Sequence, residues 1–354
     1  MQALDVNDFL DAKSLAALLR SAGALTAGAI AAVRTREHDS TWAQLTRIEV
    51  EYDEAAAGER PVHLLLKRCR GDVATTPSEV EYYTRDYVNA PGAPLVRCYG
   101  AHYDADAREY WILLADLERT HRNGWAGDPG LGYGFRLADA LAALHAPHWR
   151  AAPHWRAAPH WRAAPKQPQF ELDAFFGHVR LGLQPLLDAA GAELSPRRRD
   201  LLRRLFDEHP QRMMRRVSDA SGFTLIHGDV NPGNVLRRRD GRGPVLLIDR
   251  QPFAWSLTRW LGVSDLSTAI VHWWPTDVRR RCERPMLQRY HRALLRRCVT
   301  GYDFAQLYAD YVDCLVLSVY VAVEWCSVPQ DVERMRWLWR MQLTRALRAI
   351  EERG

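Results

Sequence analysis

The chain has 354 residues and a mass of 40.5 kDa, which exceeds what one hydrophobic core usually serves, so two lobes or two packed domains are expected. Hydrophobic residues make up 47% and charged residues 26% of the sequence, the balance of an ordinary globular protein rather than of a disordered chain. The net charge of +5, from 48 basic and 43 acidic residues, is too even to require a polyanionic partner, and no nucleic-acid partner is expected.

The cysteines and the apolar segments indicate the cellular compartment of the protein. Six cysteines are scattered without a C-x-x-C pair, which argues against a zinc site or a disulfide framework and favours reduced thiols. The N-terminus lacks the pattern of a secretory signal, and no run approaches the ~20 apolar residues that span a bilayer. A buried helix is expected for the most apolar stretch, residues 314–323. We therefore expect a cytoplasmic protein without a membrane partner, as a monomer or a homodimer.

The first part of the chain predicts one helix and then a β-rich region. Apolar side chains recur at helical spacing over residues 8–33, with Gly23 as a stop signal. Residues 48–52 alternate apolar and polar side chains as a half-buried strand does, and residues 62–67 are the expected hairpin partner. The second strand of this hairpin ends at Lys67.

A short helix and two further strands complete the predicted sheet. The helix should begin at Ser78, with Glu79 in its first turn, and the strands should cover residues 95–101 and 109–114. After these strands the pattern becomes mostly helical. This order predicts an α+β fold with a small antiparallel β-sheet lobe that carries one helix, and a larger, mostly α-helical lobe.

We place the boundary between the two lobes near residue 116, which gives an N-terminal lobe of residues 1–115 and a C-terminal lobe of residues 116–354. Within the second lobe, residues 147–165 contain the sequence Pro-His-Trp-Arg-Ala-Ala three times. A proline every sixth residue forbids a regular long helix, so a surface loop is expected. The repeated histidines are a weak metal-site candidate, because nothing else nearby supplies ligands.

Residues 225–236, with the sequence LIHGDVNPGNVL, carry the clearest functional pattern, and the apolar strand VLLID follows over residues 245–249. The polar loop contains a carboxylate at Asp229 and a carboxamide at Asn234, and the next strand ends in Asp249. Phosphoryl transfer needs this combination, because one carboxylate must face the attacking hydroxyl while a second carboxylate and a neutral oxygen hold magnesium against the phosphates.

The spacing H-x-D-x-x-x-x-N matches the catalytic loop of protein kinases, with glycine in place of arginine. It resembles the H-G-D-x-x-x-x-N signature of the aminoglycoside phosphotransferase and choline kinase superfamily, which has a metal-binding aspartate in a downstream I-D segment. Other blocks resemble the ecdysteroid-kinase-like (CHK-like) branch, over residues 78–83, 112–117, 141–146, 262–267 and 287–294. The resemblance covers roughly residues 30–325 and implies a bilobal protein-kinase-like fold. It also implies a small-molecule phosphotransferase that uses ATP, or GTP in its place, with Mg²⁺.

The resemblance assigns a role to each matching residue of the catalytic loop. Asp229 would orient and deprotonate the acceptor hydroxyl, and Asn234 and Asp249 would ligate magnesium. His227 would brace the loop, and Asp265 would anchor it from the following helix.

The resemblance also implies a nucleotide site in the first lobe. Lys67 would hold the α- and β-phosphates, with Glu79 preferred over Glu81 as its ionic partner. Backbone groups of the connecting segment would hydrogen-bond to adenine, and this segment consists of Leu114, Ala115 and Asp116.

Two departures from the superfamily pattern give further candidates. Arg250 follows Asp249 where relatives often carry an aromatic residue, so it is a candidate for contact with phosphate or substrate. The turn expected to cover the phosphates has no G-x-G-x-x-G, but Ser40 and Thr41 there offer hydroxyl and backbone donors.

The acceptor is less well defined than the reaction. An aminoglycoside would call for a dense acidic patch, whereas the second lobe is rich in arginine. A choline-like cation would need an aromatic cage and a carboxylate such as Asp265, Asp277 or Glu324. Several tryptophans of the second lobe, among them Trp273, could line a pocket or simply fill the core. We favour a neutral, partly apolar alcohol, which includes natural products, antibiotics and metabolites.

Two other classes of function compete with a kinase. A pseudokinase or nucleotide-binding regulatory module would share the fold, although the intact Asp229, Asn234 and Asp249 argue against it. A nucleic-acid-binding protein that uses the arginine clusters at residues 197–199, 237–239 and 279–281 would bind with a steep dependence on salt.

Overall fold

The computed structural model describes residues 11–39, 43–69, 76–127, 129–149, 168–251, 253 and 256–353. Ser40 and Thr41 lie outside the described residues, and so do residues 150–165 of the triple repeat. The chain divides into two compact units, which we describe separately. The first unit comprises Met1–Arg122, Leu236–Arg242 and Leu246–Ala254, and the second comprises Asn123–Val235, Gly243–Val245 and Trp255–Gly354.

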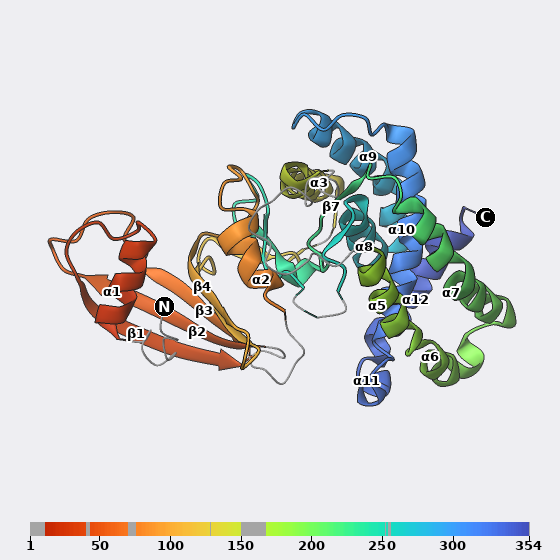
Figure 1. The fold of residues 1–354 in the computed structure, drawn as a ribbon, viewed down its shortest axis with the longest axis horizontal. Helices are drawn as coiled ribbons and strands as arrows, with labels where there is room; N and C mark the ends of the chain where they lie inside the picture. The colour runs from red at the N-terminus through yellow and green to blue at the C-terminus, as the bar shows by residue number, and fades with distance from the viewer. Residues whose placement is uncertain are drawn as a thin grey trace. The chain divides into compact units, whose positions relative to one another are not determined.

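A five-stranded antiparallel sheet with the strand order β1-β2-β3-β5-β4 forms the first unit (Figure 1). Helix α1 packs on this sheet through Leu15 and Leu19, which are both fully buried. The bounds are α1 Ala12–Ser21, β1 Ile30–Asp39, β2 Gln44–Tyr52, β3 His63–Cys69, β4 Cys98–Asp104 and β5 Glu109–Ala115.

The helix expected over residues 8–33 is wrong in its second half. Asp11 caps the start of α1 by accepting hydrogen bonds from the backbone N–H groups of the next turn. The helix ends at Ser21, and Gly23 follows with a φ of 69°, a conformation that favours glycine. Strand β1 begins at Ile30 and pairs with β2 along its length, so that tertiary pairing overrides the local helical pattern.

A second apolar layer lies on the face of the sheet that carries α2 (Ser78–Glu81). The chain continues from α2 into a π-helical turn over Tyr82–Asp86. Ile112 and Val80 belong to this layer, and Ile248, from much later in the chain, packs against it. A second, three-stranded sheet has the order β6-β8-β9, with β6 His121–Asn123, β8 Val235–Arg238 and β9 Leu246–Leu247.

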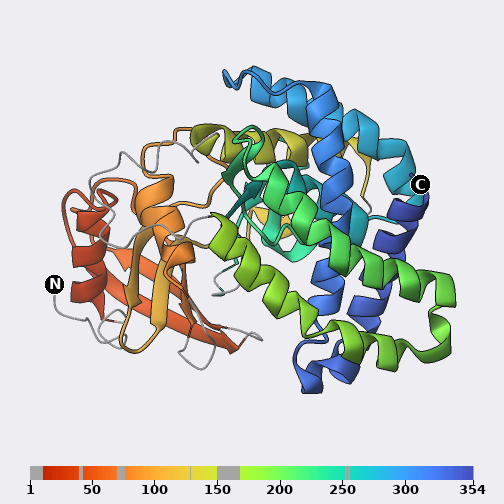
Figure 2. The same ribbon diagram turned by 45° about the vertical axis from the view of Figure 1, so that its right-hand side comes forward.

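The second unit is mostly helical (Figures 1 and 2). Helix α10 lies at its centre and contacts α5, α8, α9 and α12. A two-stranded antiparallel sheet of β7 (Phe223–Leu225) and β10 (Arg259–Leu261) sits among the helices. The helices are α3 Leu131–His145, α5 Pro168–Arg180, α6 Leu183–Ala190, α7 Pro196–Arg216, α8 Val263–Trp273, α9 Thr276–Leu295, α10 Phe304–Glu324, α11 Pro329–Arg334 and α12 Arg336–Glu351.

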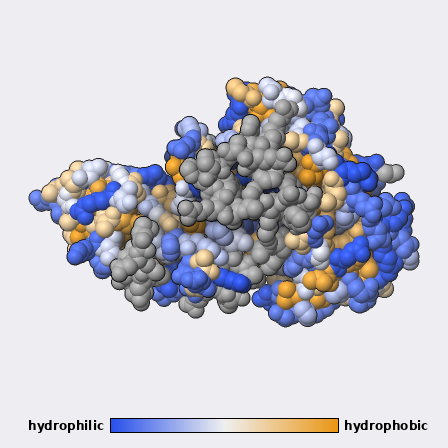
Figure 3. Space-filling model, in the orientation of Figure 1, coloured by the Kyte–Doolittle hydropathy of each residue, from blue (hydrophilic) through white to orange (hydrophobic). Residues whose placement is uncertain are grey.

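Helix α10 is long and apolar enough to cross a membrane, judged by length and composition alone. In its most apolar window, however, 67% of the residues are buried inside the protein. This burial confirms the buried helix expected over residues 314–323. On the face drawn in Figure 3, hydrophobic residues form small patches among hydrophilic ones.

The small antiparallel sheet and the helical remainder confirm the predicted α+β fold class. The first unit also takes up residues from far along the chain, because Leu246–Ala254 returns to it. This return places Asp249 in the same unit as Lys67.

Candidate active site

The H-G-D loop begins at the end of a buried strand. All three residues of β7 are buried, and β7 pairs with β10. The N–H of Ile226 donates to the carbonyl of Thr258 at 3.0 Å, which extends this pairing up to His227. The loop is therefore held at its entry by backbone bonds inside the second unit.

The carboxylate of Asp265, in α8, accepts hydrogen bonds from the backbone of the H-G-D loop. It is 3% exposed and accepts the N–H of His227 at 2.7 Å and the N–H of Gly228 at 3.0 Å. Burial raises the pKa of Asp265, but hydrogen bonds and charge from His145 and His227 outweigh burial, so the net shift is downward. A carboxylate that stays ionised is a strong acceptor for these two amides.

Two side chains that sequence reasoning missed support Asp265. His145, at the end of α3, is fully buried with Nε2 3.0 Å from Oδ2 of Asp265 and Nδ1 2.7 Å from the hydroxyl of Tyr290 in α9. Burial raises the pKa of Tyr290 far above its usual value, so the hydroxyl keeps its proton and donates to Nδ1. Nε2 of His145 then carries the hydrogen that Asp265 accepts.

Asp229 lies in the loop with one carboxylate oxygen held by two amides. Oδ2 of Asp229 accepts hydrogen bonds of 3.0 Å from Nδ2 of Asn231 and from Nδ2 of Asn234. Oδ1 of Asn231 in turn accepts the N–H of Gly233 at 2.7 Å. The amide nitrogen of Asn234 also donates to the carbonyl of Asp229, so the side-chain oxygen of Asn234 is on the branch that points the other way.

Gly228 stands where the protein-kinase pattern has arginine, and its backbone conformation favours glycine. Its φ is 86°, a region in which residues with a Cβ are strained. We expect Gly228→Ala to lower the free energy of unfolding by about 1–2 kcal/mol, the cost of a left-handed conformation, and to reduce activity by displacing Asp229. Chemical denaturation of the purified variant measures this loss.

Gly132→Ala is the matched control for this substitution. Gly132 is exposed inside α3, and an added Cβ would meet nothing within 4 Å. The control should be neutral or stabilising by about 0.5–1 kcal/mol, because alanine favours a helix interior. Equal stability of the two variants would contradict the role of the left-handed conformation.

Lys67 joins two carboxylates in the first unit. Nζ lies 2.9 Å from Oε1 and 2.8 Å from Oε2 of Glu79 in α2, and it also contacts Oδ1 of Asp249. The hydroxyl of Tyr110 in β5 donates to Glu79 as well, a contact that sequence reasoning missed. The side chain of Glu79 is 1% exposed and that of Asp249 is 51% exposed, so Lys67 links a buried acid to an open one.

The charges at Lys67 keep its ammonium group protonated. Burial lowers the pKa of Lys67, but Asp249 and Glu79 raise it more strongly, and the net shift is upward. Burial raises the pKa of Glu79, and the charge of Lys67 opposes that rise. The structure thus brings Lys67, Glu79 and Asp249 together, while their roles toward nucleotide and metal stay predictions.

Asp249 has an unusual backbone conformation. Its φ is 64°, in the left-handed region that few residues other than glycine adopt, although aspartate and asparagine tolerate it best. Such conformations are concentrated at functional sites. Ile248, just before it, packs against the apolar layer on the sheet, so the strand end is fixed while the carboxylate of Asp249 is half-exposed.

The predicted adenine segment is at the end of β5. The N–H of Ala115 donates to the backbone carbonyl of Arg97 at 2.9 Å and the N–H of Asp116 to that of His63 at 3.0 Å, while Leu114 pairs with Leu65 of β3. These two N–H groups already have backbone partners. Adenine contacts with this segment would therefore use its carbonyl groups, or would compete with these two bonds.

Arg250 is buried and contacts Ser78, Tyr82 and Asp86 of the first unit. Only 3% of the residue is exposed, and Nη1 donates to the carbonyl of Ser78 at 3.0 Å. Its guanidinium lies 5.3 Å from the ring centre of Tyr82 and 3.9 Å from Oδ2 of Asp86. These contacts support the start of α2, the helix that carries Glu79. A contact of Arg250 with phosphate or substrate stays a prediction without support from this geometry.

We expect Arg250→Gln to destabilise the protein by about 1–3 kcal/mol, the cost of leaving buried partners unsatisfied, and to leave the KM for ATP within twofold. Thermal unfolding and steady-state kinetics measure the two effects. Arg242→Gln, at an exposed position, is the control. A large rise in KM with unchanged thermal stability would instead support a phosphate contact.

The residues predicted to bind magnesium have the donor chemistry for this ion. Asp249 offers a carboxylate and Asn234 a carbonyl oxygen, and Mg²⁺ is usually held by one or two such groups, with phosphates and water completing its shell. Among the described residues, no three His, Cys, Asp or Glu side chains are grouped so as to hold a metal. A site of two protein ligands fits this composition. That Asn234, from the second unit, and Asp249, from the first, share one ion stays a prediction.

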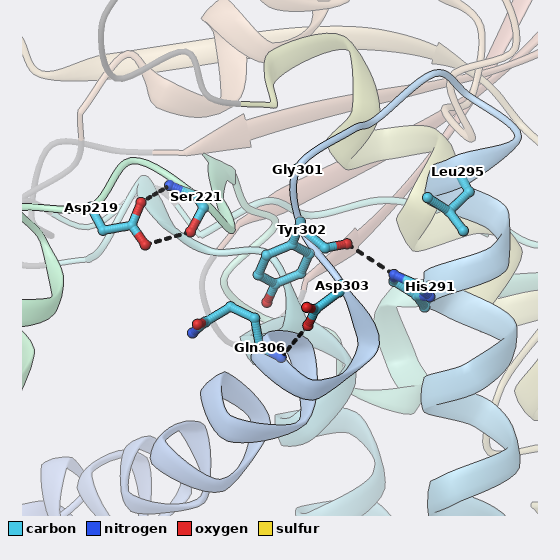
Figure 4. Close-up of a pocket in the computed structure, with 8 residues that line it drawn as sticks. All are labelled: Asp219, Ser221, His291, Leu295, Gly301, Tyr302, Asp303 and Gln306. Atoms are coloured by element: carbon cyan, nitrogen blue, oxygen red, sulfur yellow. Dashed lines mark hydrogen bonds between the residues drawn. The ribbon is translucent and has the colours of Figure 1, made fainter.

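A cavity of about 660 Å³ lies in the second unit (Figure 4). Its polar groups bind one another: Ser221 donates to Asp219 through its N–H at 2.8 Å and its hydroxyl at 2.6 Å, and His291 lies 2.9 Å from the carbonyl of Tyr302. None of the predicted site residues lines it. The lining residues are Asp219, Ser221, His291, Leu295, Gly301, Tyr302, Asp303 and Gln306.

The chain shares its kinase-like fold with a candidate aminoglycoside phosphotransferase and a glucosamine kinase of known structure, so the resemblance is confirmed at the level of the fold. It is similar to a candidate aminoglycoside phosphotransferase from Ralstonia eutropha JMP134, with 13% identity, a TM-score of 0.56, and coverage of 96% of this chain and 98% of that one. A glucosamine kinase gives 14% identity, a TM-score of 0.56, and coverage of 96% and 85%.

A second structure of glucosamine kinase, in complex with glucosamine, ADP and inorganic phosphate, matches with 13% identity and a TM-score of 0.52 over 96% of this chain and 82% of that one. The sequence matches no family model and no curated protein. The closer likeness to the ecdysteroid-kinase-like branch stays a prediction.

Proposed function

We propose that the protein is an ATP- and Mg²⁺-dependent O-phosphotransferase that moves the γ-phosphoryl group to a hydroxyl of a small molecule. The observation that carries this proposal is the contact of Lys67 with both Glu79 and Asp249. A lysine held by a buried glutamate and adjacent to a metal-binding aspartate is the arrangement that kinases use on nucleotide phosphates. The glucosamine kinase structure with ADP adds support for a nucleotide.

In this proposal the chain's own residues position the reactants. Asp229 accepts the proton of the acceptor hydroxyl, with its carboxylate oriented by Asn231 and Asn234. Lys67 binds the α- and β-phosphates. Bound magnesium would neutralise charge on the β- and γ-phosphates, and Asn234 and Asp249 are the residues that would hold it.

We favour a neutral acceptor over a choline-type cation. The three carboxylates considered for such a cation each lie against another partner. Asp265 is buried under the H-G-D loop, Asp277 is paired with Arg281 at 2.9 Å, and Glu324 lies 3.6 Å from Nε2 of His178. A neutral acceptor fits better than a quaternary amine.

A screen of hydroxyl compounds tests the proposal. The purified protein is incubated with ATP, Mg²⁺ and a panel of sugars, amino alcohols, ring alcohols and antibiotics, and products are detected as a mass gain of one phosphoryl group. We expect transfer to at least one compound, dependent on both ATP and Mg²⁺. Absence of transfer to every compound, together with absence of Mg²⁺-dependent nucleotide binding, would contradict the proposal.

A further inference from the structure

Trp125 is a large apolar side chain that the fold leaves open to solvent. It is 56% exposed on a tight turn after β6, in which the N–H of Ala126 donates to the backbone carbonyl of Asn123 and the N–H of Gly127 donates to the backbone carbonyl of Trp125. A single exposed aromatic residue is common on protein surfaces and indicates nothing by itself. The neighbours of Trp125 in the second unit, however, give a reason to consider it as a binding residue.

A second tryptophan lies against Trp125. The ring centres of Trp125 and Trp273 are 5.1 Å apart with an interplanar angle of 87°, an edge-to-face pair. Trp273 is the last residue of α8, the helix whose first turn carries Asp265. The two indoles therefore form one aromatic surface, here called the indole pair, which is attached to the helix that anchors the H-G-D loop.

The indole pair borders the catalytic loop directly. The N–H of Gly124 donates to the carbonyl of Pro232 at 2.7 Å, and a Cβ on Gly124 would lie 2.8 Å from that oxygen. Nε1 of Trp125 lies 3.3 Å from the position that a Cβ on Gly233 would take. Pro232 and Gly233 belong to the segment between Asp229 and Asn234, so the indole pair is next to the predicted catalytic residues.

The link from the indole pair to Asp229 is short. The N–H of Gly233 donates to Asn231 at 2.7 Å, and Asn231 donates to the carboxylate of Asp229 at 3.0 Å. A molecule that covers the exposed part of Trp125 would thus lie beside the loop that contains Asp229. An indole face packs against the flat apolar surface of a ring, and the three carboxylates considered for a cation each lie against another partner, so this surface suits a neutral ring.

We propose that Trp125 and Trp273 bind the ring of the acceptor, and that this acceptor is a neutral alcohol with an alicyclic or aromatic ring. This inference rests on the proposed function. The hydroxyl oxygen bonds to the γ-phosphorus as the bond from that phosphorus to the β-phosphate oxygen breaks, Asp229 takes the hydroxyl proton, and ADP leaves. The indole pair fixes the ring so that the hydroxyl is presented to Asp229.

Binding and transfer are measured separately to test this inference. Binding of cyclohexylmethanol and 2-phenylethanol, with sorbitol and choline as comparators, is followed by ligand-observed NMR in the presence of ADP and Mg²⁺. Transfer from ATP to the same compounds is followed by mass spectrometry. The variants are Trp125→Ala, Trp125→Phe, which keeps a ring, and Trp337→Ala, which removes an exposed tryptophan of α12 as a matched control.

We expect Trp125→Ala to weaken ring-alcohol binding and raise the KM for the ring alcohol by 10- to 100-fold, equivalent to about 1.4–2.7 kcal/mol, with the KM for ATP within threefold. Trp125→Phe should recover most of the loss, and Trp337→Ala should match the wild type. The inference is overturned if the ring alcohols bind Trp125→Ala as well as they bind wild type, or if the wild type prefers sorbitol or choline. Intact ring-alcohol binding without transfer to any compound would instead count against the proposed function alone.

Discussion

Asp229→Ala should lower the rate of phosphoryl transfer by roughly 10²–10⁴-fold, the usual contribution of a positioned general base. The structure gives a reason for this effect, because Asn231 and Asn234 orient one carboxylate oxygen and Asp265 fixes the backbone on the other side of the loop. Nucleotide affinity should fall far less than the rate, since Asn234 loses one hydrogen-bond partner but keeps the carbonyl of Asp229 as another. Single-turnover transfer and calorimetric titration with a non-hydrolysable ATP analogue measure the two properties.

Asp240→Ala is a suitable control for this variant, because Asp240 is an exposed carboxylate on the turn after β8. Its rate should be within twofold of wild type. Transfer by Asp229→Ala at the rate of this control would exclude Asp229 as the base. A pseudokinase would show no difference in transfer between the two variants.

Asp249→Ala should abolish the part of the nucleotide affinity that depends on Mg²⁺, a loss of at least roughly 100-fold. Loss of a residue that merely supports a metal ligand already costs about 10- to 100-fold in metal affinity, and a ligand should cost more. Lys67 would keep Glu79 as a partner, so the lysine itself should stay in place. Titration of ATP with and without Mg²⁺ gives the affinity difference directly.

Asp249→Asn separates the charge of this residue from its conformation. Asparagine tolerates the φ of 64° at this position, whereas alanine is strained there by about 1–2 kcal/mol. The asparagine variant should therefore be more stable than the alanine variant and still lose Mg²⁺-dependent affinity. Undiminished activity in both Asp229→Ala and Asp249→Ala would end the assignment as a phosphotransferase.

The parts of the fold that follow from local patterns were predictable. Strands β2, β3 and β5 alternate apolar and polar residues or form short apolar runs bounded by turns, and the prediction found all three. Strand β1 was missed, because Ile30–Asp39 contains two alanines and several charged residues without a regular alternation. It is a strand because β2 offers a partner along its length, and local sequence does not record that partner.

The candidate site also contains residues that local spacing reveals and residues that only the folded chain brings together. His227, Asp229 and Asn234 were identified because their spacing lies within one loop. His145 and Tyr290 come from α3 and α9 and meet Asp265 only in the folded chain, so no local spacing could reveal their contact. The burial of Arg250 was hidden for the same reason, since its partner Ser78 lies 172 positions earlier.

The hydrogen bonds from the H-G-D backbone to Asp265 have an evolutionary consequence. The catalytic loop is fixed from its inner side by α3, α8 and α9, whereas Trp125 touches it from the solvent side. If the proposed function holds, substitutions of Trp125 could change which alcohol is accepted while the hydrogen bonds from the loop backbone to Asp265 stay in place.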